Sequence, residues 1–290
     1  MSSSEQRTAY FIPEPSPWPI VGMVSLLTTL IGAVLAMNGV GVGKFVVMGG
    51  LLMFAYLLFG WFRDVISENL ADRYNQQVDR SFRMGMFWFI ASEVFFFLAF
   101  FGALFYIRNI ALPWLGGDGY LGATRAILYS QFDPAWPSHG PGALGGDFKA
   151  MGAWGIPALN TLLLLSSGAT LTWAHWGLKQ GNQKTLVQGL IATIGLGLLF
   201  VGFQAYEYIH AYGELNLTLQ SGVYGSTFYM LTGFHGFHVT MGAIMLMAIL
   251  GRSMKGHFST HNHFAFEAVA WYWHFVDVVW LGLFIFVYWF

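Results

Sequence analysis

Trp18–Met37 reads WPIVGMVSLLTTLIGAVLAM, a stretch without a single charged side chain. An α-helix needs about 20 mostly apolar residues to cross the hydrocarbon core of a bilayer. The polar, proline-rich segment before it lacks the basic region and the cleavage site of a signal peptide, so we expect the stretch to remain in the protein. It predicts a membrane-spanning helix.

Similar apolar stretches recur along the whole chain. Of its 290 residues, 56% are hydrophobic and 9% are charged, whereas soluble domains carry about 25% charged residues. So little charge cannot cover a water-exposed surface, and the sequence predicts an all-α, polytopic membrane protein with seven transmembrane helices. The expected spans are Trp18–Met37, Phe45–Phe62, Met84–Ile107, Trp154–Leu178, Thr185–Tyr206, Tyr224–Leu250 and Phe266–Phe290.

The composition also excludes several classes of function. The chain has no cysteine, which excludes disulfides, thiolate metal sites and a cysteine nucleophile. Its net charge of −1 offers no basic surface for nucleic acid. The Walker motif, the dinucleotide fingerprint and the GxSxG elbow are missing as well.

The basic residues predict the orientation, because Lys and Arg are enriched in cytoplasmic loops. One set of alternate loops holds nine of them and the other set holds Lys44, Arg108, Arg125 and Lys149. We therefore expect the N-terminus inside and the C-terminus outside. The expected location is a bacterial cytoplasmic (inner) membrane, with the mitochondrial inner membrane as the alternative. The nine are Arg7, Arg63, Arg73, Arg80, Arg83, Lys179, Lys184, Arg252 and Lys255.

Glu93 is the one acidic or basic residue of the third expected span and lies beside Phe95–Phe97. A carboxylate at mid-bilayer costs roughly 3 kcal/mol on insertion scales. Two interpretations remain open. Glu93 is either a buried functional carboxylate or a protonated acid that hydrogen-bonds to a neighbouring helix.

Two histidines of the sixth span, His235 and His238, are three residues apart and share one helix face. Two imidazoles on one face could ligate a haem or a metal ion. We favour the simpler interpretation, in which they make hydrogen bonds between helices. Because the chain also has no cysteine, the sequence predicts no haem, copper or zinc bound tightly by this chain.

A polar helix seam runs along the seventh span. Glu267, Trp271, His274 and Asp277 fall within an arc of about 120°. We expect this face to look into protein, where it hydrogen-bonds to neighbouring helices or to a partner subunit. A proton pathway is the alternative, and it is disfavoured because Trp271 interrupts the series of titratable groups.

Other polar residues lie towards the ends of the spans. Gln204 and Glu207 share a face near the outer end of the fifth span, where we expect an interfacial cap. His261 and His263 lie near the inner end of the seventh span. We interpret these histidines as interfacial residues rather than as metal ligands.

Several motifs resemble subunit III of the haem–copper cytochrome c oxidases. The run Tyr224–His238 is similar to the family's sixth helix, and Phe266–Trp280 is similar to its seventh. Shorter matches follow in the same order along the chain and leave out mainly the long third loop. They are Ser16–Pro19, Trp61–Ile66, Ser92–Phe97, Asn160–Thr161 and Thr172–His175.

The resemblance implies one membrane domain, residues 1–290, with a V-shaped two-plus-five bundle. Residues 1–62 would form the first two helices, 63–83 an inner connector, and 84–290 a five-helix bundle with an extended outer loop at 109–153. It implies a non-catalytic core subunit of an aa3-type oxidase. The subunit would pack against subunit I, with subunit II in the complex and cytochrome c as electron donor, and would support proton uptake and stability. Haem and copper would reside in the partner subunits, and this chain would bind structural phospholipids but no cofactor.

Residue by residue, Glu93 matches the family's buried carboxylate. Positions near lipid head groups are matched by Trp61, Arg63, Glu68 and Arg252, and a guanidinium suits bidentate phosphate binding. Phe62 and Ser67 depart from the family, with Phe62 replacing a common Trp and Ser67 a common Arg.

Three other functions fit parts of the sequence. One is a quinol-oxidase or nitric-oxide-reductase type homologue of subunit III. Another is a proton-coupled transporter that uses Glu93 and the acids of the seventh span. The third is a haem protein that uses His235 and His238.

Overall fold

The structure, a computed structural model, describes residues 11, 13–143 and 145–289, and those residues form helices and loops without a β-strand. The chain divides into two compact units, one holding the described residues up to Met84 and the other those from Gly85 onward. The long helices are α2 (Trp18–Met37), α3 (Gly43–Leu70), α4 (Gln76–Tyr106), α7 (Ile156–Lys179), α8 (Gln183–Glu214), α9 (Gly222–Met254) and α10 (Phe264–Leu283).

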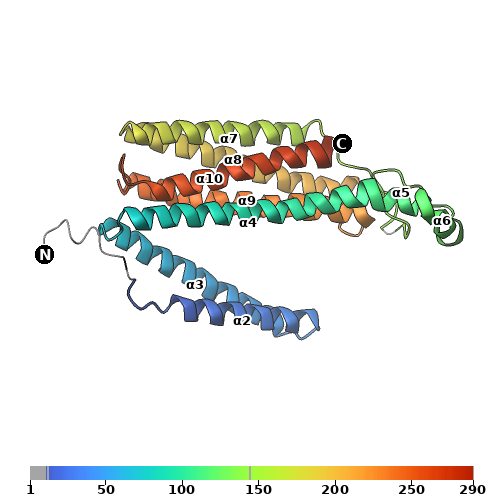
Figure 1. Ribbon diagram of the computed structural model, residues 1–290, viewed down its shortest axis with the longest axis horizontal. Coiled ribbons are helices and arrows are strands. Elements are labelled where there is room, and N and C mark those ends of the chain that lie inside the picture. Colours follow the sequence, from blue (N-terminus) through green and yellow to red (C-terminus); the bar gives the residue numbers. More distant parts are fainter. Residues whose placement is uncertain (1–10, 12, 144, 290) are drawn as a thin grey trace. The chain divides into compact units, whose positions relative to one another are not determined.

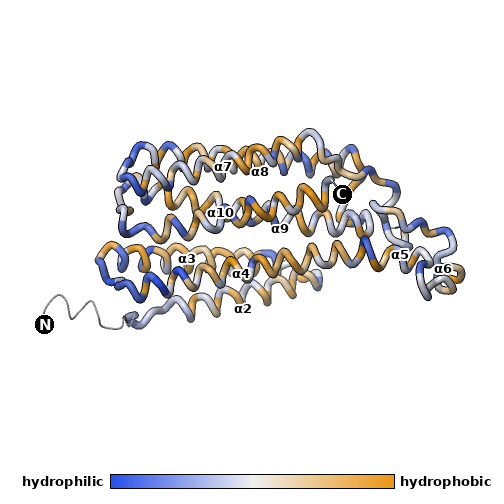
Figure 2. Tube along the Cα trace, turned by 45° about the horizontal axis from the view of Figure 1, so that its top comes forward, coloured by the Kyte–Doolittle hydropathy of each residue, from blue (hydrophilic) through white to orange (hydrophobic). Residues whose placement is uncertain are grey.

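Six stretches of the described chain are long and apolar enough to cross a membrane. They contain α2, α3, α4, α8, α9 and α10, and α10 continues into a π-helix at Phe284–Trp289. Helix α7 has 24 residues but is not among the six. Hydrophobic residues dominate the long helices, and hydrophilic residues gather at their ends and in the connections (Figure 2). These features define a polytopic, all-helical membrane protein.

In the first unit, α2 and α3 form a closely packed hairpin. A Cβ atom added to Gly32, Gly43 or Gly50 would collide with backbone atoms of the facing helix. Glycine is therefore required for this close approach. The Trp18 indole Nε1 also donates a hydrogen bond to Asp64 Oδ2 at 2.7 Å, which joins the start of α2 to the last turns of α3.

In the second unit, α7 and α8 meet along small residues. A Cβ atom on Gly189 would lie 2.7 Å from the Cβ atom of Ala174, and one on Gly177 would lie 2.8 Å from the side chain of Thr185. Farther along, Trp273 of α10 fills the space beside Gly197 and donates a hydrogen bond to Ser167. Small residues at such positions allow helix backbones to approach closely.

Helix α4 packs differently, through large aromatic rings. The ring of Phe96 lies 5.0 Å from that of Phe234 on α9, and Phe97 lies 6.1 Å from Phe275 on α10. Phe97 is 2% exposed, whereas the neighbouring Phe95 is 68% exposed. One face of α4 is therefore bound to the bundle of α7, α8, α9 and α10 (Figure 1).

The inner connector at 63–83 and the outer loop at 109–153 both contain more helix than their polar composition indicates. Within residues 63–83, only Ala71–Asn75 lies outside α3 and α4. The long loop begins with a π-helix (Ile107–Ala111), followed by α5 (Leu112–Leu115), a 3₁₀ turn and α6 (Gly122–Leu128). Charged side chains at helix ends need no apolar environment, so hydropathy locates the membrane spans more accurately than it locates the helix termini.

Candidate functional site

Glu93 and His238 form a pair between α4 and α9. His238 Nε2 lies 2.9 Å from Glu93 Oε2, and His238 Nδ1 lies 2.7 Å from the Phe234 carbonyl oxygen. A carbonyl only accepts hydrogen bonds, so Nδ1 must carry a proton. The bond between Nε2 and Oε2 then contains one further proton, held by either partner. In both cases the pair has no net charge, which suits an apolar interior.

The surroundings of this pair are aromatic. The imidazole of His238 lies 5.0 Å from the ring of Phe97 and stacks on Tyr272 at 6.3 Å. The side chain of Glu93 is 22% exposed and that of His238 is 9% exposed. A proton-sharing pair without net charge is thus largely enclosed by aromatic rings, and the one hydroxyl among the rings named here, that of Tyr272, donates to the His238 carbonyl oxygen at 3.4 Å.

His235 faces a different partner. Its Nε2 donates a hydrogen bond to the Val276 carbonyl oxygen at 3.1 Å, and its ring packs against Phe200 and Trp280. His235 and His238 share a face of α9, but they bond to different helices. The structure therefore does not bring these two histidines together around a common ligand.

The polar seam of α10 divides into separate contacts. His274 Nδ1 lies 3.4 Å from Asp277 Oδ2, and Asp277 is buried against α7, where a Cβ atom on Gly168 would meet its carboxylate. Trp271 is 37% exposed, and the side chain of His274 is 44% exposed. The seam therefore includes both interior positions and positions on the outside of this chain.

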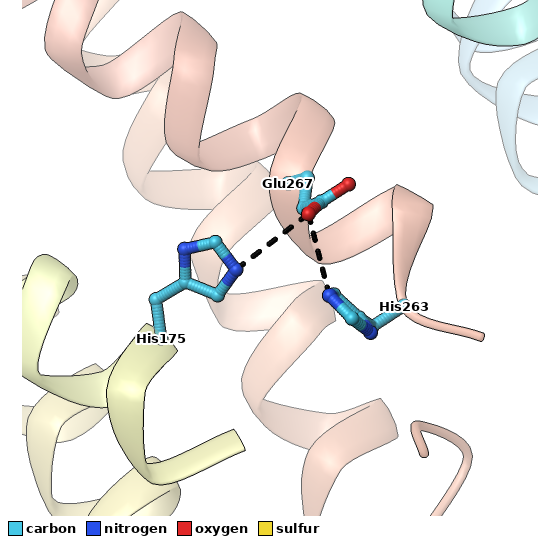
Figure 3. Close-up of side chains that lie close together, drawn as sticks. All are labelled: His175, His263 and Glu267. Carbon is cyan, nitrogen blue, oxygen red and sulfur yellow. Dashed lines mark ion pairs between the residues drawn. The ribbon is translucent and has the colours of Figure 1, made fainter. Parts of the chain in front are cut away.

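Glu267, at the start of α10, joins a second cluster with His175 and His263. Oε1 of Glu267 lies 3.7 Å from Nε2 of His175 on α7 and 3.3 Å from Nε2 of His263. Figure 3 shows both imidazoles directed towards this one oxygen. The three side chains are 21%, 10% and 14% exposed for His175, His263 and Glu267. His263, interpreted from the sequence as an interfacial residue, thus pairs with Glu267 at the start of α10.

The prediction of an interfacial cap at Gln204 and Glu207, near the outer end of the fifth expected span, is wrong. Gln204 is 5% exposed and Glu207 is 1% exposed. The Tyr288 hydroxyl donates a hydrogen bond to Glu207 Oε1 at 2.7 Å. The carboxylate lies inside the bundle because this face of α8 is turned towards the π-helix that continues α10 and contains Tyr288. The position of Glu207 along its own span could not reveal this contact.

The residues predicted to bind lipid lie on both units. On α3, Trp61 and Arg63 are exposed, and Glu68 accepts a hydrogen bond of 2.6 Å from the Tyr74 hydroxyl. Burial raises the pKa of Tyr74, and the contact with Glu68 raises it further. On α9, the guanidinium of Arg252 lies 4.6 Å from the ring centroid of Phe258. A phospholipid at these residues stays a prediction.

The described chain is thus a multi-pass helical membrane protein with titratable side chains paired between its helices. The family model described as cytochrome c oxidase subunit III matches residues 8–117 and 130–290. The chain belongs to this family.

Curated relatives support the assignment over the full length. A cytochrome c oxidase subunit 3 of Marchantia polymorpha is 43% identical over 288 residues, which cover 99% of this chain and 98% of the relative. The proteins of the same name from Arabidopsis thaliana and Dugong dugon are 41% and 39% identical over 285 and 287 residues. These alignments cover 98% and 99% of this chain and 97% and 98% of the respective relatives. The resemblance found in the sequence motifs is confirmed, and with it the membership of a respiratory oxidase complex.

Proposed function

We propose that this chain is a non-catalytic core subunit of an aa3-type cytochrome c oxidase, packed against subunit I. One observation carries the proposal: the chain matches proteins named cytochrome c oxidase subunit 3 from end to end. Electrons from cytochrome c would enter through the partner subunits, which hold the haem and copper. The complex would reduce dioxygen and pump protons.

The proposed topology has seven spans in a two-plus-five arrangement, in which α7 is the fourth span along the chain. Helix α7 carries a single charged residue, Lys179, at its last position. Its close packing against α8, which is itself apolar enough to cross a membrane, favours α7 crossing the bilayer beside it. The proposed orientation places the N-terminus inside, as the distribution of Lys and Arg favours. The proposed location is a bacterial cytoplasmic membrane, with the mitochondrial inner membrane as the alternative.

The role in proton uptake and stability rests on the Glu93–His238 pair. A neutral pair that shares a proton can accept or release charge only at an energetic cost inside apolar surroundings. It therefore suits a supporting role near the proton path better than an obligatory relay, which would require further titratable neighbours. Phe96 and Phe97, which lie beside the pair and carry no titratable group, favour this supporting role.

The proposed lipid site includes Trp61, Arg63, Glu68 and Arg252. Both Trp61 and Arg63 are exposed on α3, and the guanidinium of Arg63 makes no ion pair with another described residue. An exposed guanidinium beside an aromatic ring is well suited to a phospholipid head group.

Copurification tests the proposed function. A tagged chain, extracted in mild detergent from its native membrane, should bring with it partner subunits that contain haem and copper. The visible spectrum of the preparation should then contain the bands of haem a. A transporter would purify without haem-bearing partners, and a haem protein that uses His235 and His238 would retain its spectrum when the isolated chain is measured. Either result would contradict the proposal.

A further inference from the structure

The cluster of His175, His263 and Glu267 has the composition of a metal site. Two imidazoles and one carboxylate are a frequent set of protein ligands for Zn²⁺. Among the described residues, this is the group of His, Asp and Glu side chains whose ligand atoms converge, all lying within 4.8 Å of one another. The ligands come from the last turns of α7 and the start of α10, as Figure 3 shows.

The spacing fits metal ligands better than hydrogen bonds. Two ligands about 2.0–2.1 Å from a tetrahedral Zn²⁺ lie about 3.4 Å apart. The two Nε2 to Oε1 distances in the cluster, 3.3 Å and 3.7 Å, fall on either side of that value. A charge-assisted hydrogen bond is shorter, about 2.7–2.9 Å, as in the Glu93–His238 pair at 2.9 Å.

The second nitrogen of His263 supports the same conclusion. Nδ1 lies 3.0 Å from the Ser259 carbonyl oxygen and must donate to it. In the neutral ring this leaves a lone pair on Nε2, directed at the cluster. Histidines that ligate metals commonly donate their other N–H to a carbonyl or carboxylate in this way, which fixes both tautomer and orientation.

His175 supplies the third ligand atom. Its Nε2 is buried and makes no hydrogen bond with the described residues. A cation would provide this nitrogen with the partner that it lacks. Lys179, one helical turn further along α7, places a positive charge on the same helix and should moderate the affinity without occupying the site.

We propose that His175, His263 and Glu267 bind a Zn²⁺ ion that joins the end of α7 to the start of α10. Three protein ligands leave a fourth position for water, so binding should be reversible. The site replaces the expectation, drawn from the absence of cysteine, that this chain holds no zinc. Imidazole and carboxylate ligands need no thiolate.

Zinc content of the assembled oxidase tests the proposal. The complex is treated with a chelator, incubated with ZnCl₂, desalted and analysed by plasma mass spectrometry, with haem as the measure of protein. The wild type should retain about one more zinc than H263Q or E267Q, because loss of a direct ligand should weaken binding by more than the roughly 10–100-fold that changes to outer-shell partners cost. Sites in partner subunits cancel in this difference.

His210→Gln is the matched control. His210 and Glu214 form another His–Glu pair four residues apart, at 3.2 Å and more exposed, but no third His, Asp or Glu of the described chain joins them as a possible ligand. This variant should bind zinc like the wild type. Zinc-edge absorption of the wild type should also give nitrogen and oxygen neighbours at about 2.0–2.1 Å.

Equal zinc in the wild type, H263Q and E267Q, at normal haem content, would overturn the proposal. So would a loss of zinc in His210→Gln as large as in H263Q.

Discussion

Glu93 illustrates how one acidic residue is accommodated among phenylalanines. Its partner His238 already donates one N–H to a carbonyl, so the pair holds a single proton between Nε2 and Oε2. The pair is neutral whichever residue holds that proton. Such a pair costs far less to bury than an unpaired carboxylate.

Glu93→Gln should leave the initial rate of dioxygen reduction largely unchanged. The amide N–H of Gln can donate to His238 Nε2, so the hydrogen bond persists while the shared proton is removed. Any loss should affect pumping efficiency or the number of turnovers before inactivation. The measurements are oxygen uptake and proton release by the assembled complex.

Ser92→Ala is a suitable control, because Ser92 is exposed and bonds only to the Phe89 carbonyl of its own helix among the described residues. A fall in the Glu93→Gln turnover by orders of magnitude, at normal haem content, would place Glu93 on the obligatory proton path and would refute a supporting role.

Arg63→Ala should loosen bound phospholipid without preventing membrane insertion. Removing the exposed guanidinium deletes a bidentate phosphate ligand. Lipid retained after delipidation can be measured by mass spectrometry, with Arg80→Ala as a control for the loss of an exposed positive charge from the same unit. Equal lipid in both variants and in the wild type would contradict the proposed site.

Among the helices, α7 and α8 depend most visibly on small residues. Gly189→Ala should destabilise the protein by about 1–3 kcal/mol, because the new methyl group overpacks against Ala174. Gly195→Ala, on the exposed face of the same helix, meets no atom within 4 Å. It should be neutral or stabilising by up to about 1 kcal/mol through higher helix propensity.

Thermal unfolding of the detergent-purified protein distinguishes the two glycine variants. A lower unfolding temperature for Gly189→Ala than for Gly195→Ala is the expected result. Equal temperatures would show that α7 and α8 move apart easily enough to accept the methyl group.

The helices themselves could largely be predicted from the sequence, because an apolar run of sufficient length has few alternatives to a membrane helix. Their mutual contacts could not. The α-helical repeat places Glu93 on a particular face of its helix. It does not show that this face meets His238, which is 145 residues away in the sequence. The exact ends of α3 and α4 were missed for a related reason, since polar residues continue a helix beyond the apolar core.

Among the site residues, too, the sequence indicated individual polar side chains but not the contacts that they make with other helices. Glu93, His238 and Glu267 could be selected because a polar side chain in an apolar span is conspicuous. His175 was noticed only within a motif, and His263 was assigned to the interface. Their meeting with Glu267 depends on the end of α7 lying beside the start of α10, which no local pattern encodes.

For the whole molecule, the seven-span topology can be tested with reporter fusions. Reporter fusions at Arg73 and at Asp133 should report opposite sides of the membrane, because the expected third span separates them. Fusions at the N-terminus should agree with Arg73, and a fusion after α10 should agree with Asp133. Arg73 and Asp133 on the same side would refute this topology.

The contrast between the glycine contacts of α7 with α8 and the aromatic contacts of α4 has a consequence for biosynthesis. Helices α7 and α8 are made in succession, and the contacts at Gly177 and Gly189 need only these two helices. Helix α4 leaves the ribosome earlier, yet its partners Phe234 and Phe275 lie on α9 and α10, the last helices to be translated. Until α9 and α10 have been made, Phe96 and Phe97 of α4 therefore lack the aromatic partners that they have in the folded chain.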